Sequence, residues 1–273
     1  MDILFGNVAG VIVFALGAAV GSFINVVVYR VPAGLSVLWP RSRCPRCLHQ
    51  LGNGENVPVL GWLRLRGRCR HCSCKISVRY PVVEAVTGLL FLLNFWTFGV
   101  SIYSIGYWTF CSWLLALSLI DVDTMTLPNP LTQSGLVAGL VFALVAGFLP
   151  EASCKGALNE LMFGIIGAVL GLWLFDVIAV VGSITLGQAA MGAGDAKLAA
   201  MLGAWLGWKY LLLAGFLACA LGAFVGGGAI ALGVLNRRQP MPFGPFLALG
   251  AVITLFGGNA ILSAYVRLVF PST

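Results

Sequence analysis

Two aspartates in a sequence with few charged residues are the side chains best suited to chemistry. Asp195 closes the run Met-Gly-Ala-Gly-Asp at residues 191–195, and Asp121 ends a long apolar stretch. Carboxylates at the edges of membrane helices are costly, so they are functional candidates. Two of them from different helices would form a dyad, in which one carboxylate takes a proton from water while the other carboxyl donates one. The pattern therefore predicts hydrolysis of a bond such as a peptide bond at a membrane edge.

Membrane helices are the elements that must position these aspartates. Of the 273 residues, 60% are hydrophobic and 9% are charged, which excludes an ordinary soluble domain. A span needs about 20 residues, and the first uncharged run is too long for a signal-peptide core. We predict an all-α polytopic membrane protein with about eight transmembrane helices. They are expected at residues 5–28, 81–98, 102–120, 130–149, 158–181, 195–207, 209–235 and 245–267.

The basic residues predict the orientation of these helices. Segment 30–80 holds ten of the 16 lysines and arginines: Arg30, Arg41, Arg43, Arg46, Arg64, Arg66, Arg68, Arg70, Lys75 and Arg79. The positive-inside rule places this segment in the cytoplasm. Both aspartates then lie near the cytoplasmic face, and both termini lie outside. The net charge of +7 accordingly indicates topology and contact with the membrane surface, and it does not indicate nucleic-acid binding.

Segment 30–80 also contains two C-x-x-C pairs. They are Cys44-Pro45-Arg46-Cys47 and Cys69-Arg70-His71-Cys72. Four thiolates in this pattern suit the tetrahedral coordination of a structural zinc. Disulfides and redox cysteines are the alternatives, and the reducing side of the membrane disfavours disulfides. Cys74, His49 and His71 lie close enough in the sequence to replace a ligand, so the four-cysteine assignment stays open.

These motifs, with several others, occur in an order that resembles a known family. The other pieces are Gly21-Ser22-Phe23-Ile24-Asn25-Val26-Val27-Val28-Tyr29-Arg30, Arg79-Tyr80-Pro81 with Glu84, Ile120-Asp121 followed by Leu127-Pro128-Asn129, Gly192-Ala193-Gly194-Asp195-Ala196-Lys197-Leu198, and Pro242-Phe243-Gly244-Pro245-Phe246. The sequence resembles the type IV prepilin peptidases, bacterial inner-membrane aspartyl proteases of the G-x-G-D type. The resemblance covers nearly the whole chain.

This resemblance implies which acids are catalytic. The family places its first catalytic residue seven positions before the proline, so Asp121 fits with Pro128 and Asp123 does not. Asp195 is the second catalytic residue. Because Asp195 opens a helix and Asp121 ends one, the helix dipoles favour a charged Asp195. We expect Asp195 to be the base and Asp121 to hold the shared proton of this coupled pair.

Further residues are expected to support the site. Gly192 and Gly194 would allow positive φ and the close approach of a substrate backbone, and Pro128 follows the first aspartate. Lys197 either acts on Asp195 or extends to the lipid headgroups. Glu84 and Asp176 are either accessory acids or interfacial carboxylates paired with basic residues. Asp123 is expected in a loop at the mouth of the site.

The resemblance implies a domain plan and a reaction. The plan is a first transmembrane helix at 1–29, a cytoplasmic zinc-binding domain at 30–80 and a seven-helix membrane peptidase core at 81–273. The implied reaction removes the short basic leader of type IV prepilins and type II secretion pseudopilins after a glycine, on the cytoplasmic side. Many members then methylate the new N-terminus with S-adenosylmethionine, and the cysteine insertion favours that second activity. The expected cofactors are Zn²⁺ and S-adenosylmethionine, and the expected partners are prepilins, pseudopilins and membrane lipid.

Two rival functions remain open from the sequence. A pure peptidase would use the zinc domain only for stability or docking. A transporter or channel with a regulatory zinc domain would place acids across a midplane pathway between repeated, broken helices, whereas here the key acids lie at one face. A metalloprotease is disfavoured because H-E-x-x-H is absent and both histidines lie in the cysteine segment.

Overall fold

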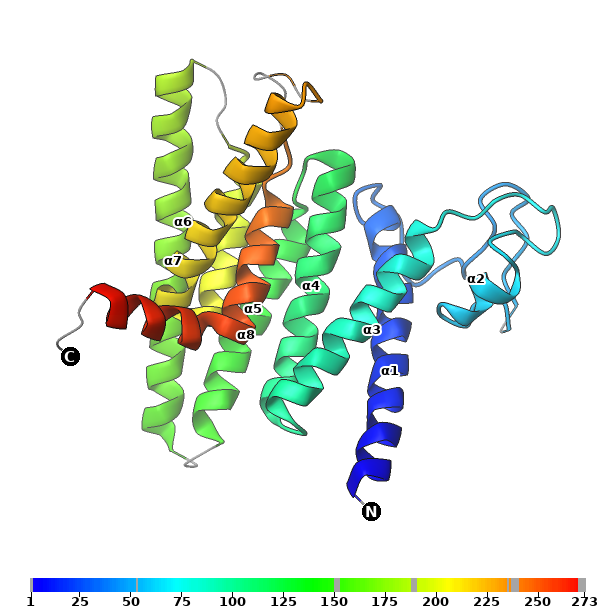
Figure 1. The fold of residues 1–273 in the computed structure, drawn as a ribbon, viewed down its shortest axis with the longest axis horizontal. Helices are drawn as coiled ribbons and strands as arrows, with labels where there is room; N and C mark the ends of the chain where they lie inside the picture. Colours follow the sequence, from blue (N-terminus) through cyan, green and yellow to red (C-terminus); the bar gives the residue numbers. More distant parts are fainter. Residues whose placement is uncertain are drawn as a thin grey trace. The chain divides into compact units, whose positions relative to one another are not determined.

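The computed structural model describes residues 2–52, 54–149, 153–187, 191–234, 236 and 241–269, and its elements are helices (Figure 1). The helices are α1 (Asp2–Arg30), α2 (Leu60–Arg64), α3 (Arg79–Phe98), α4 (Ile102–Thr124), α5 (Asn129–Phe148), α6 (Cys154–Leu186), α7 (Ala193–Ala231) and α8 (Gly244–Val269). Within these residues, seven helices are long and apolar enough to cross a membrane. The predicted all-α polytopic class is confirmed.

Helix α7 accounts for the difference between the eight predicted helices and these seven. It has 39 residues, so as a straight helix it would be about 58 Å long, nearly twice the roughly 30 Å hydrocarbon core of a bilayer. Gly207 interrupts it with φ 73° and ψ 170°, and the two halves run in different directions (Figure 1). The predicted segments 195–207 and 209–235 are therefore both present and meet at this glycine.

The chain forms two compact units, Met1–Ala116 and Leu117–Thr273. We refer to them as unit 1 and unit 2, and the boundary between them falls inside α4. Unit 1 contains α1, α2, α3 and the cysteine segment. Unit 2 contains the end of α4 and helices α5 to α8, and it holds both candidate catalytic aspartates.

Glycines bring α1 and α3 together in unit 1. A Cβ atom on Gly21 would lie 2.7 Å from the Cα of Glu84, and one on Gly17 would lie 2.8 Å from the Cα of Gly88. Only small residues allow helix backbones to approach this closely in a membrane. The Asn25 side-chain amide also donates to the carbonyl of Tyr80 at 3.2 Å, which fixes the register of the two helices at this end.

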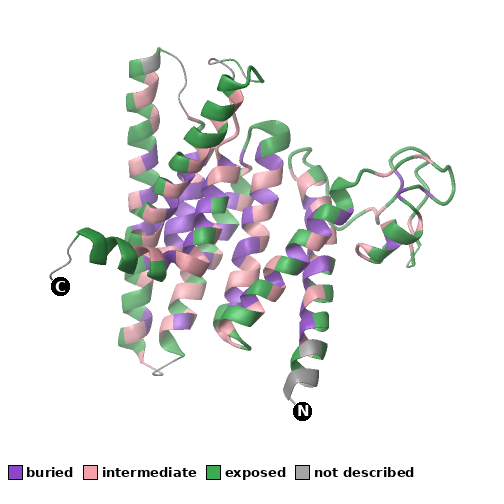
Figure 2. Ribbon diagram, viewed as in Figure 1, coloured by how far each residue is buried: buried purple, intermediate pink, exposed green. Residues whose placement is uncertain are grey.

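Unit 2 is organised around the first half of α7. All of its residues from 195 to 205 except Lys197 are buried, and they form the centre of the unit in Figure 2. Small residues again allow this packing, because a Cβ on Gly203 would meet the backbone of Gly167 in α6. The indole N–H of Trp205 donates to the carbonyl of Gly135 in α5 at 2.8 Å. The helix that begins with the G-x-G-D turn is therefore fixed on several sides.

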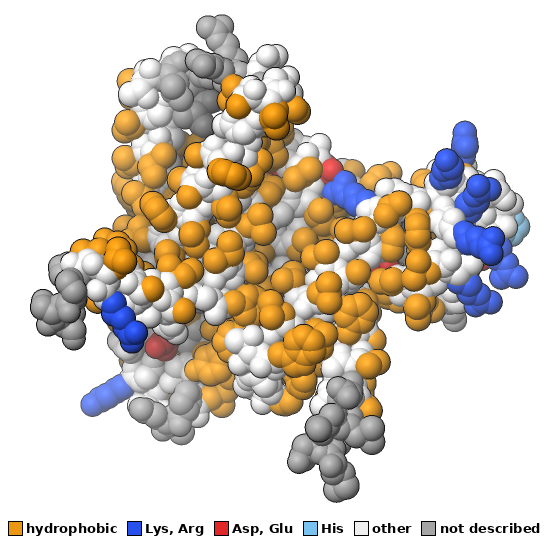
Figure 3. Space-filling view, viewed as in Figure 1, with side chains coloured by type: hydrophobic (Ala, Val, Ile, Leu, Met, Phe, Trp, Pro, Cys, Tyr) orange, Lys and Arg blue, Asp and Glu red, His pale blue; other side chains and the backbone are white. Residues whose placement is uncertain are grey.

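The surface of the helices differs from that of the cysteine segment. Hydrophobic side chains cover much of the helical surface in Figure 3, whereas Lys and Arg side chains gather over the segment that follows α1. An apolar helical exterior is what lipid contact requires, since the chains of the lipid solvate no polar group. The protein is a multi-pass membrane protein with one strongly basic polar segment.

Candidate active site and metal centre

Asp121 lies near the C-terminal end of α4, and its side chain is only 5% exposed. Its Oδ2 accepts a hydrogen bond from the backbone N–H of Gly244 at 2.9 Å. Gly244 is the first residue of α8, where backbone N–H groups lack partners within the helix. The start of α8 therefore holds the carboxylate of Asp121 in place.

Asp195 is the third residue of α7, and its side chain is 6% exposed. Its Oδ2 accepts a hydrogen bond from the backbone N–H of Gly192 at 3.2 Å, and its own N–H donates to the carbonyl of Gly192 at 3.0 Å. This is the acidic half of a capping box, which satisfies donors at a helix start. A capping role and a catalytic role are compatible here, because the cap uses only one oxygen of the carboxylate.

Two contacts join residues 127–129, which follow α4, to the start of α7. A Cβ on Gly194 would lie 2.9 Å from the Cβ of Leu127, so this glycine packs directly on the buried leucine. The ammonium of Lys197 donates to Oδ1 of Asn129 at 2.7 Å. The carboxylates of Asp121 and Asp195 are also close enough for their charges to interact. The structure therefore brings the two aspartates into one site.

The backbone of the supporting glycines differs from the expectation. Gly192 has φ −76°, and neither it nor Gly194 is among the positive-φ glycines of the described chain, so the expected left-handed conformation is wrong. Gly194 is instead required by its contact with Leu127. The half-buried Lys197 bonds to the side-chain amide oxygen of Asn129. Pro128 precedes α5 with φ −62°, and its carbonyl accepts from the N–H of Thr132.

Gly244 is the residue whose role the sequence did not reveal. The motif Pro242-Phe243-Gly244 is visible in the sequence, but nothing in it indicates that its N–H reaches an aspartate 123 positions away. A Cβ on Gly244 would lie 2.7 Å from Oδ2 of Asp121. Because a helix N-terminus faces Asp121 as well as Asp195, the helix ends no longer distinguish the two carboxylates, and the location of the shared proton stays a prediction.

The other candidate acids lie elsewhere. Asp123 is exposed and still belongs to α4, so its expected position in a loop is wrong. Asp176 is exposed on α6. Glu84 belongs to unit 1, where it is 8% exposed and its Oε2 accepts from the N–H of Val59 at 2.6 Å. This bond ties α3 to the residue that precedes α2 and gives Glu84 a structural partner.

The arrangement of Asp121 and Asp195 suits acid–base chemistry on a bound substrate. Each carboxylate is held through Oδ2 by one backbone N–H. Among the described residues, the hydrogen bonds of both carboxylates are made through Oδ2 and none through Oδ1. One oxygen of each carboxylate is thus left for water or for a substrate amide. The atoms that support the site belong to the backbone at the ends of rigid helices.

The four cysteines of the C-x-x-C pairs form one cluster, at the place where the sequence predicts a metal site. The Sγ atoms of Cys44, Cys47, Cys69 and Cys72 all lie within 4.8 Å of one another. The Sγ atoms of Cys44 and Cys72 are 3.8 Å apart, and those of Cys47 and Cys69 are 3.9 Å apart. Tetrahedral zinc with Zn–S bonds of about 2.3 Å requires sulfur separations of about 3.8 Å. The donor set and its spacing therefore fit one zinc ion.

The two halves of this centre have the same backbone conformation. The N–H of Cys44 donates to the carbonyl of His49, and the N–H of Cys69 donates to that of Cys74, each at 2.9 Å. Leu48 and Ser73 follow the two pairs with φ 59° and 55°. Each pair thus forms a tight turn that presents two thiols, a local geometry set by six neighbouring residues.

The alternative metal ligands, His49, His71 and Cys74, lie outside the group of four thiols. His49 and His71 stack on each other, with ring centroids 3.9 Å apart, and neither belongs to the group of four thiols. Cys74 lies beside the group, with its Sγ 3.5 Å from that of Cys44, a distance at which an S–H can donate to a thiolate. Backbone N–H groups of Cys47 and Arg46 lower the pKa of the Cys44 thiol to about 6, which favours the thiolate that zinc binds.

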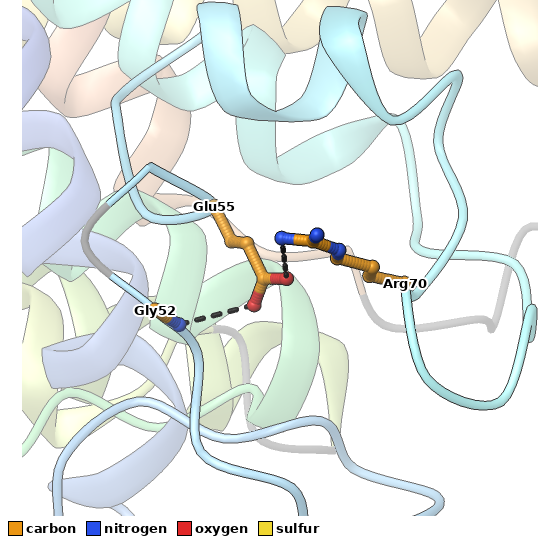
Figure 4. A network of polar contacts seen from close by, with 3 residues as sticks. All are labelled: Gly52, Glu55 and Arg70. Atoms are coloured by element: carbon orange, nitrogen blue, oxygen red, sulfur yellow. Dashed lines mark hydrogen bonds and ion pairs between the residues drawn. The ribbon is translucent and has the colours of Figure 1, made fainter.

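The rest of the cysteine segment has little to hold it. Glu55, its single acid, accepts from the N–H of Gly52 at 3.0 Å and lies 3.9 Å from Arg70 (Figure 4). The Arg70 side chain is 75% exposed, so this ion pair adds little stability. The indole of Trp62 donates to the carbonyl of Ile76 at 3.1 Å. A bound metal would be the strongest interaction in the segment.

Comparisons with known proteins agree with this geometry. The profile of the Bacterial Peptidase A24 N-terminal domain matches residues 15–98, and that of the Type IV leader peptidase family matches residues 108–227. A protein of Aeromonas hydrophila named prepilin leader peptidase/N-methyltransferase is 37% identical, over 93% of this chain and 92% of its own. One of the same name from Burkholderia pseudomallei (strain K96243) is 40% identical, over 89% and 84%. No solved structure gives a significant match.

Proposed function

This chain belongs to the type IV leader peptidase family, and from that membership we propose that it is a membrane aspartyl endopeptidase with prepilins and pseudopilins as substrates. It removes the short basic leader after a glycine. The observation that carries the proposal is the pair of buried carboxylates, Asp121 and Asp195, each oriented by a backbone N–H. The transporter alternative finds no support in the relatives, whose names describe a peptidase.

In the proposed reaction the two aspartates share one proton. The charged carboxylate takes a proton from a water molecule as the oxygen of that water attacks the scissile carbonyl carbon. The protonated carboxyl donates its proton to the carbonyl oxygen. As the C–N bond breaks, the carboxyl that took the water proton donates it to the leaving amine, and a hydroxyl of the tetrahedral intermediate returns a proton to the other carboxylate. The pair ends with one proton, as it began. The backbone N–H groups of Gly192 and Gly244 orient the carboxylates throughout.

The site of cleavage is proposed to be the cytoplasmic edge of the inner membrane. Asp121 is the fourth residue from the end of α4, and Asp195 is in the first turn of α7. Ten of the 16 basic residues lie in segment 30–80, and the positive-inside rule places that segment in the cytoplasm. A leader that emerges from the bilayer on this side would meet helix ends rather than helix centres.

We propose that the protein also methylates the new N-terminus with S-adenosylmethionine, as the names of its relatives indicate. No arrangement among the described residues identifies a pocket for this donor, so the proposal rests on the relatives. Zinc, held by Cys44, Cys47, Cys69 and Cys72, would supply structural stability to the cysteine segment. A pure peptidase is the alternative.

One experiment tests both activities. Purified protein in detergent is incubated with a prepilin and S-adenosylmethionine, and the product is read by mass spectrometry. A shortened product with an added methyl group supports both activities, and a shortened product without it supports the pure peptidase. An uncleaved substrate contradicts the proposed function. The same assay with the Asp195→Asn variant is the negative control for cleavage.

A second experiment tests whether the cysteine segment contributes to methylation. The double variant Cys69→Ser, Cys72→Ser should lose zinc, and we expect methylation to fall at least as much as cleavage. The reason is that unit 2 holds both aspartates by its own packing. Supplying a pre-cleaved substrate separates the two activities. Methylation of that substrate at the normal rate would show that the segment is not needed for the second activity.

A further inference from the structure

The turn at residues 36–40, just after α1, is built around one arginine. Arg30 is the last residue of α1, and its guanidinium donates to the carbonyl of Ser36 at 2.9 Å and to that of Pro40 at 2.6 Å. The hydroxyl oxygen of Ser36 accepts hydrogen bonds from the backbone N–H groups of Leu38 and Trp39, each at 3.3 Å. The turn is therefore folded back onto the end of the helix.

This turn exposes two large apolar side chains. Leu38 is 82% exposed and Trp39 is 72% exposed. Arg30 bonds to the carbonyls of residues on either side of them, and it is also where the candidate span Val8–Arg30 ends. Tyr29, on the last turn of α1, is 71% exposed. Tryptophan and tyrosine are enriched where a membrane helix meets the headgroups, because their rings are apolar and their polar atoms remain hydrated.

The charge of the same segment identifies the surface that it faces. Residues 30–80 contain ten basic residues and one acid, Glu55, and that acid is already near Arg70. Such a segment is attracted to anionic lipid headgroups. A basic peptide is repelled by it, so the basic leader of a substrate is a poor occupant. Apolar side chains that enter the interface and basic ones beside them are the features of an interfacial anchor.

We propose that the turn at residues 36–40 is a lipid anchor, in which Leu38 and Trp39 enter the headgroup region of an anionic leaflet. Arg30 sets the depth of the anchor, because it binds the turn to the end of a transmembrane helix. The anchor holds the start of the cysteine segment at the membrane surface, since only three residues separate Pro40 from Cys44. This inference does not depend on the catalytic proposal.

Depth-dependent quenching of Trp39 tests the anchor. The full chain and its Trp39→Phe variant are placed in nanodiscs of phosphatidylcholine and phosphatidylglycerol, with bromines either near the glycerol or near the end of the acyl chains. The difference between the two emission spectra isolates Trp39. We expect a blue-shifted signal that bromines near the glycerol quench more than bromines near the chain ends, and that aqueous acrylamide quenches weakly.

Trp173 provides a matched control for depth. It is 68% exposed on α6, within the candidate span Cys154–Thr185, so the difference signal of Trp173→Phe should be quenched by bromines within the chains. If Trp39 is quenched by acrylamide as strongly as free tryptophan and by bromines at neither depth, the anchor is overturned. A Trp39 signal shielded from both quenchers would also overturn it and would indicate a protein partner.

The contribution of Arg30 is tested by Arg30→Lys, which keeps the charge but loses the planar group that reaches two carbonyls. We expect bromine quenching of Trp39 to fall and acrylamide quenching to rise, whereas Arg68→Lys, a change at an exposed position, should alter neither. If Arg30→Lys does not fold, Leu38→Asp gives the same test without touching the turn's hydrogen bonds. Unchanged quenching in Leu38→Asp would overturn the anchor.

Replacing phosphatidylglycerol with phosphatidylcholine should weaken the quenching of Trp39 by bromines near the glycerol, and no change would overturn the anionic part of the proposal.

Discussion

The aspartate site in unit 2 and the cysteine site in unit 1 are held together in different ways. Asp121 and Asp195 are 5% and 6% exposed, and each is fixed by the N–H of a residue at the start of a long helix. The four cysteines lie in two short turns, and Cys47 and Cys72 are exposed. Around the aspartates there is packed helix on several sides, whereas around the cysteines there are exposed loops.

This difference separates a site that helix packing maintains from a site that a bound metal would maintain. The carboxylates need no bound group to keep their positions, because small residues and backbone contacts already fix α7 against α6 and α5. The thiols have little core behind them, and structural zinc sites of this kind contribute their binding free energy to folding. Perturbing each site should therefore have different consequences for structure and for activity.

The largest effect is expected from the aspartates. Asp121→Asn and Asp195→Asn should each abolish leader cleavage while membrane insertion and helix content stay unchanged. Neither carboxyl alone can both accept and donate the required protons, and acid–base catalysis contributes about 10²- to 10⁴-fold. The amide oxygen of asparagine can still accept the N–H of Gly244 or Gly192, so the packing should survive. Cleavage is measured by mass spectrometry and helix content by circular dichroism.

Asp123 is the control for this prediction. It lies two residues from Asp121 and is exposed, so Asp123→Asn should retain substantial cleavage. An inactive Asp123→Asn together with an active Asp121→Asn would reverse the assignment of the first catalytic residue.

Removal of the metal should affect structure first and chemistry second. We expect about one zinc per chain, with Cys44→Ser and Cys72→Ser each releasing it. Proteolysis within residues 41–78 should then become faster, because a bound metal would be the main interaction of that segment, while α5 to α8 stay resistant. Metal analysis and limited proteolysis measure the two effects.

Cys74 is the matched control for the metal site. Its Sγ is 3.5 Å from that of Cys44, but it lies outside the group of four thiols, so Cys74→Ser should keep the zinc. Zinc loss in Cys74→Ser with zinc retained in Cys72→Ser would mean that Cys74 is the zinc ligand in place of Cys72. A protein without zinc whose cysteines are oxidised in pairs would contradict both the ligand set and the predicted orientation.

A smaller effect is expected at Gly244. A Cβ there would lie 2.7 Å from Oδ2 of Asp121, so Gly244→Ala should displace the carboxylate or the start of α8. A hydrogen bond to a charged group contributes about 1.5–3 kcal/mol, and its loss would lower the rate of cleavage about 10- to 100-fold. Gly257→Ala on the same helix is the control, because the nearest atom to its Cβ would be Cδ1 of Ile261 at 3.7 Å. Equal rates of cleavage for the two variants would show that Gly244 does not contribute to the site.

The smallest effect is expected at Lys197. Its bond to Asn129 is exposed, and exposed polar interactions of this kind contribute about 1 kcal/mol or less. Lys197→Ala should lower cleavage by less than about tenfold, since 1.4 kcal/mol corresponds to a tenfold change. A complete loss of cleavage with normal folding would mean that Lys197 touches the substrate.

Local patterns in the sequence predicted most of the elements and both cysteine turns. The expected helix at 81–98 is α3 (Arg79–Phe98), and the expected pair 195–207 and 209–235 is α7 with its break at Gly207. Long uncharged runs specify helices in lipid, because no other open structure satisfies its backbone there. Helix α2 (Leu60–Arg64) was not predicted, since five residues carry too little periodicity.

The sequence by itself determined which residues are present and how each short segment folds: apolar runs as helices, C-x-x-C pairs as thiol-presenting turns, and a candidate aspartate at the edge of each of two helices. Only the tertiary structure decided what faces each aspartate. The N–H of Gly244 reaches Asp121 across 123 positions, and Gly194 is small because Leu127 packs on it rather than because of its φ angle. Contacts between distant segments depend on how helices pack, and packing follows from the shapes of many side chains at once, which no local pattern records.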